Sequence, residues 1–265
     1  MTEVNYLESL NPLQYESVCS TEGPNLIIAG AGTGKTKVLT TRVAHIIDNN
    51  LAFPSQILCV TFTNKAAREM SERVQKLVSQ NMEKMPWMGT FHSIGAKIIR
   101  NHAEVIGLKQ SFTILDKDDQ LSLIKQIIKA ENLDQSQFSP KLIQSKIDHW
   151  KNKALNPNDI KSESLDNLVD EKSLSIYKIY QARLFEINCL DFGDLLLQCI
   201  NLFKVPDIHK RYSNNFKYIH VDEYQDTNAA QYKWLKLLGS HHQNVCCVGD
   251  DDQSIYSWRG AEVDN

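Results

Sequence analysis

The chain contains a glycine-rich segment, AGAGTGKT at residues 29–36, whose residue types suit the binding of phosphate. Glycines allow backbone N–H groups to converge on phosphate oxygens, and a helix that starts at such a loop adds the positive end of its dipole. Lys35 can neutralise phosphate charge, and the hydroxyl of Thr36 can ligate magnesium. The general pattern has glycine where this chain has Ala29. The segment predicts a nucleoside triphosphate site; the alternative is a glycine-rich turn with an accidental lysine.

An acidic pair, Asp222 and Glu223, lies in the segment VDEYQDTN at residues 221–228, at the end of an apolar run. Adjacent carboxylates at a strand end can divide the work of hydrolysis. Asp222 would support magnesium through water, and Glu223 would orient and deprotonate the attacking water. Alone, such a pair is more often a solvated strand end or a helix cap. Together with a phosphate-binding loop it predicts nucleotide hydrolysis.

A third segment, GDDDQSIYSWRGA at residues 249–261, combines acids, an amide, two aromatic residues and an arginine. Gln253 is suited to sensing a γ-phosphate by hydrogen bonding. Tyr256 and Trp258 offer flat faces on which bases could stack, at about 1 to 3 kcal/mol each. Because aromatic residues at i and i+2 of a strand share one face, spacing alone slightly favours a place in the core for both.

Each of the three segments follows a short apolar run that is typical of a buried parallel strand. Four such runs occupy residues 26–29, 57–62, 218–221 and 245–248. After the first two runs, apolar positions recur with helical spacing. We therefore expect an α/β fold with a doubly wound parallel sheet, helices on both faces, and ligands at the carboxyl ends of the strands.

A long insertion separates the second run from the third. About 155 residues lie between them, whereas a parallel crossover needs only a dozen or more. Residues 116–188 repeat apolar side chains at helical spacing, and Ser139 before Pro140 suits the start of a helix. We expect an inserted all-helical subdomain at residues 113–190. Residues 1–112 and 191–265 would form the nucleotide-binding domain.

The composition is that of an ordinary globular protein. Of the 265 residues, 42% are hydrophobic and 23% charged, and the net charge of −3 excludes nucleic-acid binding by basic charge alone. No apolar run is long enough to span a membrane, and the first residues lack a secretory signal, so we expect an intracellular, cytoplasmic protein. The cysteines form no CxxC pair and are expected to be reduced thiols, buried in the case of Cys59, Cys246 and Cys247. We expect no structural metal.

Together, and in this order, the three segments resemble those of the UvrD, Rep and PcrA type of superfamily 1 DNA helicases, and UvrD most of all. The phosphate-binding loop of that family typically begins with alanine, as it does here. LNPLQ at residues 10–14 resembles the family's adenine-reading motif, VTFTNKAAREM at 60–70 and GTFHS at 89–93 its single-strand contact motifs, and LDFGDLL at 190–196 its return from the insert. The likeness covers essentially the whole chain.

The resemblance implies a RecA-like P-loop domain with ATP and Mg²⁺ as its cofactors. The implied nucleotide site consists of Gln14, which reads adenine, and of Ala29, Gly30, Ala31, Gly32, Thr33, Gly34, Lys35, Thr36 and Thr40. Thr36 and Asp222 would hold magnesium, while Lys35, Asp222, Glu223 and Gln253 would serve hydrolysis and its coupling to DNA. The implied single-strand track is Phe62, Asn64, His92, Tyr256, Trp258 and Arg259.

Each member of the track has an ordinary structural alternative. Taken singly, Phe62 could be a core residue, Asn64 a helix cap and His92 a structural histidine. Lys37 departs from the arginine that is common at that position of the family, which removes a planar group that could stack.

The resemblance further implies an ATP-dependent 3′–5′ DNA helicase that acts on single-stranded DNA and duplex junctions. Such a motor needs a second RecA-like domain, whose arginines and other motifs are missing from this sequence. We therefore expect the chain alone to bind nucleotide and DNA, to hydrolyse slowly and to unwind nothing. Two alternatives are a truncated, non-catalytic ATP- and DNA-binding module and the helicase subunit of a recombination nuclease. A small P-loop kinase fits less well, because it needs no base-stacking loop.

Overall fold

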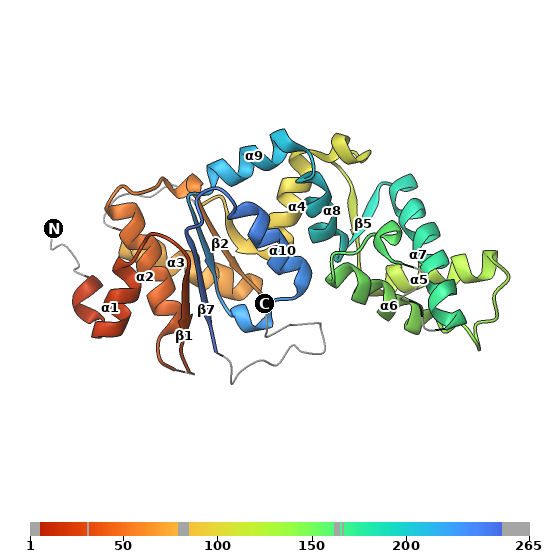
Figure 1. The fold of residues 1–265 in the computed structure, drawn as a ribbon, viewed down its shortest axis with the longest axis horizontal. Helices are drawn as coiled ribbons and strands as arrows, with labels where there is room; N and C mark the ends of the chain where they lie inside the picture. Colours follow the sequence, from red (N-terminus) through yellow and green to blue (C-terminus); the bar gives the residue numbers. More distant parts are fainter. Residues whose placement is uncertain (1–5, 31, 79–84, 162–164, 166, 251–265) are drawn as a thin grey trace. The chain divides into compact units, whose positions relative to one another are not determined.

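The computed structural model describes residues 6–30, 32–78, 85–161, 165 and 167–250, which Figure 1 draws as a coloured ribbon. These residues form two compact units. The first takes its described residues from Met1–Ile94, Val205–Thr227 and Leu235–Asn265, and the second from Gly95–Lys204 and Asn228–Trp234.

The first unit is built on a five-stranded sheet in which every neighbouring pair is parallel, in the order β1-β7-β6-β2-β3. The strands are β1 (Asn25–Ile28), β2 (Ile57–Thr61), β3 (Met88–Thr90), β6 (Tyr218–Val221) and β7 (Val245–Gly249). The four predicted strands are thereby confirmed. Strand β3 was not predicted, because its three residues include a glycine and form no apolar run. The result is the α/β, RecA-like sheet that the sequence predicts.

Helices flank this sheet (Figure 1). Those of the first unit are α1 (Pro12–Cys19), α2 (Lys35–Asp48), α3 (Asn64–Leu77) and α9 (Pro206–Asn215), while α4 (Phe91–Asn101) and α10 (Ala229–Leu238) contribute residues to both units. The side chain of Thr63 caps α3 by accepting a hydrogen bond from the N–H of Ala66 at 3.1 Å. Thr63, and not Asn64, is therefore the cap of this helix.

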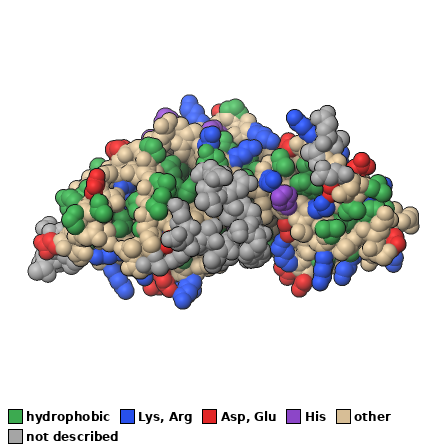
Figure 2. Space-filling model, turned by 60° about the horizontal axis from the view of Figure 1, so that its bottom comes forward, with side chains coloured by type: hydrophobic (Ala, Val, Ile, Leu, Met, Phe, Trp, Pro, Cys, Tyr) green, Lys and Arg blue, Asp and Glu red, His purple; other side chains and the backbone are tan. Residues whose placement is uncertain are grey.

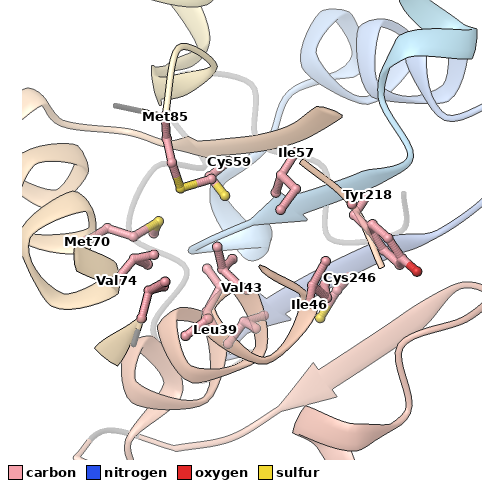
Figure 3. Close-up of a cluster of buried hydrophobic side chains, with 14 residues drawn as sticks. Leu39, Val43, Ile46, Ile57, Cys59, Met70, Val74, Met85, Tyr218 and Cys246 are labelled. Atoms are coloured by element: carbon pink, nitrogen blue, oxygen red, sulfur yellow. The ribbon is translucent and has the colours of Figure 1, made fainter. Parts of the chain in front are cut away.

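One face of the sheet packs against α2 and α3 (Figure 3). Apolar residues of α2 such as Leu39 and Val43, and residues of α3 such as Met70 and Val74, join strand residues such as Cys59 in one buried cluster. Their helical spacing had predicted both helices. Because α2 begins directly after the glycine-rich loop, its packing against the sheet fixes the position of that loop.

The second unit is mainly helical. It contains α5 (Lys117–Ala130), α6 (Pro140–Asn152), α7 (Leu168–Glu186) and α8 (Asp194–Leu202), together with a parallel pair of short strands, β4 (Thr113–Leu115) and β5 (Cys189–Asp191). The helices predicted for the insert are present, and the strand pair at its two ends was not predicted. This unit also extends beyond residues 113–190. The two units are defined by compactness, whereas the predicted boundaries mark where an insert begins and ends in the sequence. The domain boundaries at 113 and 190 therefore stay a prediction.

A buried ion-pair cluster joins α6 to β5 and α8 within the second unit. The Nζ atom of Lys151 lies 2.7 Å from Oδ2 of Asp191 and 2.9 Å from Oδ2 of Asp194, and at most 3% of each of these side chains is exposed. The hydroxyl of Tyr180 donates to Asp191 at 2.9 Å, and the amide of Gln181 donates to Asp194 at 3.0 Å. The cluster thus satisfies charges that burial would otherwise make costly.

All six cysteines lie in the part of the chain that the structure describes, and all are free thiols. Cys59 and Cys246 are buried, whereas Cys247 is only half-buried, which corrects the expectation for that residue. Among the described residues, no helix is long and apolar enough to cross a membrane. The same residues contain no group of three or more His, Cys, Asp or Glu side chains that could hold a metal ion.

Candidate functional site

The parallel sheet of the first unit brings the sequence motifs to one edge. Because all its strands run in the same direction, the segments after β1, β7, β6, β2 and β3 leave from the same side of the sheet. The glycine-rich loop follows β1, Asp250 follows β7, and the acidic pair follows β6. Phe62 follows β2, and His92 follows β3. The segments predicted to bind phosphate therefore lie on one half of the edge and the candidate DNA contacts on the other.

The backbone of the glycine-rich loop turns sharply before α2. Gly32 and Gly34 have positive φ angles of 73° and 92°, and the hydroxyl of Thr33 donates to the carbonyl of Gly30 at 2.7 Å. No atom lies within 4 Å of the place that a Cβ at Gly32 would take. The loop therefore leaves open space beside its backbone, as the approach of a phosphate group requires. Ala31 lies outside the described residues.

Lys35, the first residue of α2, is folded back over the loop. Its Nζ atom donates to the carbonyl of Ala29 at 2.9 Å and pairs with Oδ2 of Asp250 at the same distance. Only 10% of the Lys35 side chain and 4% of that of Asp250 are exposed. The lysine is thus held by an anionic partner at the position from which it would contact phosphate.

Asp222 lies at the end of β6 with 4% of its surface exposed. Burial raises the pKa of this carboxyl to about 6, the neighbouring carboxylate of Glu223 adds to the shift, and Lys35 and Arg73 oppose it. A cation would stabilise the ionised form that burial disfavours. Oxygen ligands such as carboxylates and hydroxyls are those that magnesium prefers, so the side chains of Asp222 and Thr36 are each of a type that could hold this ion.

Glu223 adopts a left-handed backbone conformation, with φ of 54°. Such a conformation is unfavourable for a residue with a side chain and is found preferentially at functional sites. The amide of Gln225 donates to Oε2 of Glu223 at 2.8 Å, and the carbonyl oxygen of the same amide accepts from the backbone N–H of Asp250 at 3.0 Å. Gln225 therefore connects the loop after β6 with the loop after β7.

Gln225 and Asp250 are site residues that were not predicted individually. Both belong to segments that were recognised as motifs, but their contacts join distant parts of the sequence. Gln225 and Asp250 are 25 residues apart, and Asp250 and Lys35 are 215 residues apart. The available signal was that both are polar residues in segments that follow strand-like apolar runs. Contacts over such distances follow from the order of the strands in the sheet, which the spacing of the motifs does not give.

Gln14 lies in the first turn of α1 and reaches the glycine-rich loop. Its Oε1 accepts from the backbone N–H of Asn11 at 3.1 Å, and its Nε2 donates to the carbonyl of Thr33 at 2.9 Å. Since an N–H can only donate and a carbonyl can only accept, these partners fix the orientation of the amide. One N–H and one lone pair of the amide remain for a further partner, which is the pair of groups that the edge of an adenine can match.

Two further residues near the loop are already bonded. The ammonium of Lys37 donates to the carbonyl of Ser9. The hydroxyl of Thr40 donates to the carbonyl of Thr36 at 2.8 Å, and Thr40 is 1% exposed. Its observed contact is thus with the helix backbone, and direct contact of Thr40 with a nucleotide stays a prediction.

The described candidates for DNA contact lie after β2 and β3, which are neighbours in the sheet. Phe62 is half-buried, and its ring packs edge-on against the buried Phe91 with 5.5 Å between centroids. Asn64 is exposed in the first turn of α3, and His92 is half-buried in the first turn of α4. On the face that Figure 2 shows, Lys and Arg side chains are interspersed with Asp and Glu. The residue types of the three candidates, an aromatic ring, an amide and an imidazole, suit binding by stacking and polar contacts more than by charge.

Five predicted site residues lie outside the described part of the chain: Ala31, Gln253, Tyr256, Trp258 and Arg259. Their roles stay predictions from the sequence.

Comparison with known proteins gives the family of the chain. The family model for the UvrD/REP helicase N-terminal domain matches residues 10–265. DNA helicase II of Rickettsia typhi is 50% identical over 269 residues, which cover 100% of this chain and 40% of the relative. ATP-dependent DNA helicase PcrA of Staphylococcus aureus is 49% identical over 260 residues, which cover 98% of this chain and 35% of the relative. The chain spans 40% or less of the length of these relatives, and it belongs to the UvrD/REP helicase N-terminal domain family.

Proposed function

We propose that this chain is the ATP-binding and single-strand-binding first motor part of an ATP-dependent 3′–5′ DNA helicase. The observation that carries the proposal is the arrangement at the carboxyl edge of the sheet. Lys35 and Asp250 lie beside the glycine-rich loop, Asp222 and Glu223 follow the next strand but one, and the candidate DNA contacts follow the two strands beyond. The names of the relatives, DNA helicase II and PcrA, support the same activity.

In the proposed reaction, Lys35 exchanges the carboxylate of Asp250 for phosphate oxygens of ATP. Thr36 and Asp222 are the residues that would hold magnesium, which, when bound, draws charge from the phosphates. Glu223 accepts a proton from the water that attacks the γ-phosphorus, while the bond from this phosphorus to the β,γ-bridging oxygen breaks and ADP leaves with the electron pair. The hydrogen bond from Gln225 restricts the Glu223 carboxylate to one position, which favours a defined direction of proton transfer.

Single-stranded DNA would lie across the loops after β2 and β3, in contact with Phe62, Asn64 and His92. This places DNA on the same sheet edge as the nucleotide, so that a change at one site can be passed to the other through the strands between them. Unwinding also requires a second RecA-like domain as partner, because ATP-driven motion needs two bodies that close on the nucleotide. The cytoplasmic location stays a prediction.

The proposal is tested by measuring ATP hydrolysis with magnesium, with and without single-stranded DNA, for the wild type and for Glu223→Gln. We expect slow hydrolysis whose rate DNA changes and Glu223→Gln reduces by at least about a hundredfold, the scale of general-base catalysis, while ATP binding remains. If Glu223→Gln retained the wild-type rate, Glu223 would not be the base. If DNA changed neither the rate nor the affinity for ATP, the proposed DNA contacts would be wrong.

A further inference from the structure

Arg42 is a buried cation that the proposed reaction does not use. It lies on α2 and is 1% exposed. Its guanidinium donates to two backbone carbonyls, that of Ser17 and that of Thr21, the latter at 3.1 Å. Ser17 belongs to the last turn of α1, and Thr21 lies two residues beyond its end. Arg42 therefore binds the carboxyl end of the helix whose first turn contains Gln14.

Little else in α1 holds this helix in place by apolar packing. Val18 is the one buried residue of its eight, and Leu13 and Tyr15 are 75% and 49% exposed. A helix of this length is marginal by itself. Unpaired carbonyls at a helix end favour a cation, and a planar guanidinium can serve two of them at once. Polar contacts at the two ends of α1 therefore add to the packing of Val18 in fixing the position of this helix.

The opposite end of α1 carries the contact with the phosphate loop. There the amide of Gln14 is fixed between Asn11 and the carbonyl of Thr33, with one N–H and one lone pair remaining. Asn11 caps the helix, so any tilt or shift of α1 moves Asn11 and Gln14 together relative to the loop. Arg42 resists such a shift from α2, the helix that begins with Lys35.

We propose that Arg42 is a positioning residue for base selection: by anchoring α1 to α2, it holds the Gln14 amide where it can read an adenine base. This inference rests on the proposed ATP site. Arg42 itself does not contact the nucleotide. Its loss should therefore weaken discrimination between bases and leave the binding of the triphosphate largely intact.

The experiment compares the affinities of ribose-labelled fluorescent ATP and GTP, with magnesium, for the full chain. The variants are Arg42→Met, Arg42→Lys, Gln14→Ala and the double variant Arg42→Met with Gln14→Ala. Arg183→Met removes an exposed arginine of the second unit and serves as the matched control. Lys35→Ala tests nucleotide binding as such, and circular dichroism establishes that each variant is folded.

We expect the wild type to prefer ATP, and Gln14→Ala and Arg42→Met each to reduce this preference by about tenfold, as expected from the loss of hydrogen bonds to the base. The affinity for GTP should stay within about twofold, and the double variant should show no further loss. Arg42→Lys keeps the positive charge but loses the planar guanidinium that donates to two carbonyls at once, so it should retain part of the preference for ATP over GTP. If Arg42→Met does not fold, the ratio of ATP to GTP affinity in Arg42→Lys tests the proposal instead. This ratio should lie between those of the wild type and Gln14→Ala.

Equal weakening of ATP and GTP by the Arg42 substitutions would overturn the proposal and leave Arg42 with a general structural role. An unchanged preference, or a wild type that binds ATP and GTP alike, would overturn it as well. Failure of the proposed function looks different, because the wild type and Lys35→Ala would then bind both nucleotides equally poorly.

Discussion

The buried cluster around Lys151 gives a stability prediction whose size can be worked out from the structure. Lys151→Met keeps most of the apolar stem but removes the cation from between Asp191 and Asp194, all three being at least 97% buried. Loss of one partner of a buried ion pair typically costs about 3 to 5 kcal/mol. For a chain of this size, about 2 to 4 °C of melting temperature correspond to each kcal/mol. We expect the transition of the second unit to fall by about 6 to 20 °C at pH 8.

The loss of stability caused by Lys151→Met should depend on pH. Burial, and then repulsion by Asp191, raises the pKa of Asp194 to about 6 from an ordinary value of 3.8, although Lys151 opposes the shift. A carboxyl whose pKa is raised by folding takes up protons in the folded state, so its contribution to stability falls as pH rises from about 4 to about 6. Lys151 holds the pKa of Asp191 below its ordinary value despite burial, so without the lysine the pKa values of both carboxyls should rise. The variant should therefore lose most stability above pH 7 and approach the wild type near pH 5.

Melting curves at pH 5 and pH 8 test this prediction, and hydrogen exchange followed by mass spectrometry locates the loss in α6 and α8. Lys117→Met is the matched control, because Lys117 pairs with Asp148 at the surface with 63% of its side chain exposed, and such pairs contribute about 1 kcal/mol at most. The reasoning is refuted if Lys151→Met is as stable as Lys117→Met at pH 8, or if its deficit is the same at both pH values.

Three further predictions concern the nucleotide site. Gln225→Ala removes the hydrogen bonds that Gln225 makes to Glu223 and to the backbone N–H of Asp250, and should cost about 1 to 3 kcal/mol in chemical denaturation; a cost equal to that of the exposed Gln135→Ala would contradict this. Because burial raises the pKa of Asp222 to about 6, its carboxylate gains charge as pH rises through 6. Affinity for magnesium-ATP should therefore rise more steeply between pH 5.5 and 7 in the wild type than in Asp222→Asn, where only the phosphate titrates. Calorimetric titration checks this, and parallel curves would argue against Asp222 as the ligand. Phe62→Ala should weaken binding of single-stranded DNA by about 1 to 3 kcal/mol without changing ATP affinity, as measured by fluorescence anisotropy; equal loss of both would indicate a core role.

Much of the fold could be predicted because its signals are local. Short windows of sequence show the apolar runs at residues 26–29, 57–62, 218–221 and 245–248 and the helical spacing in α2 and α3. Strand β3 gives no such signal, since three residues with a glycine are too few for a pattern. The same is true of β4 and β5, whose pairing joins residues 113–115 to residues 189–191.

In the candidate site, too, local features could be predicted and long-range contacts could not. The loop, Lys35 and the acidic pair could be predicted because each motif is contiguous. The contacts that organise them are not contiguous: Lys35 meets Asp250 only because β1 and β7 are neighbours, and Gln225 reaches Asp250 only because β6 lies beside β7. Strand order is set by the packing of the whole sheet, so these partners could not be read from spacing.

The central claim is that Lys35 exchanges the carboxylate of Asp250 for the phosphates of ATP. Isothermal titration of a slowly hydrolysed ATP analogue with magnesium into the wild type and into Lys35→Ala tests it most directly. We predict one site in the wild type and an affinity about 10 to 150 times lower in the variant, the loss of one hydrogen bond to a charged group. Equal affinities of the two proteins would contradict the assignment of the phosphate site.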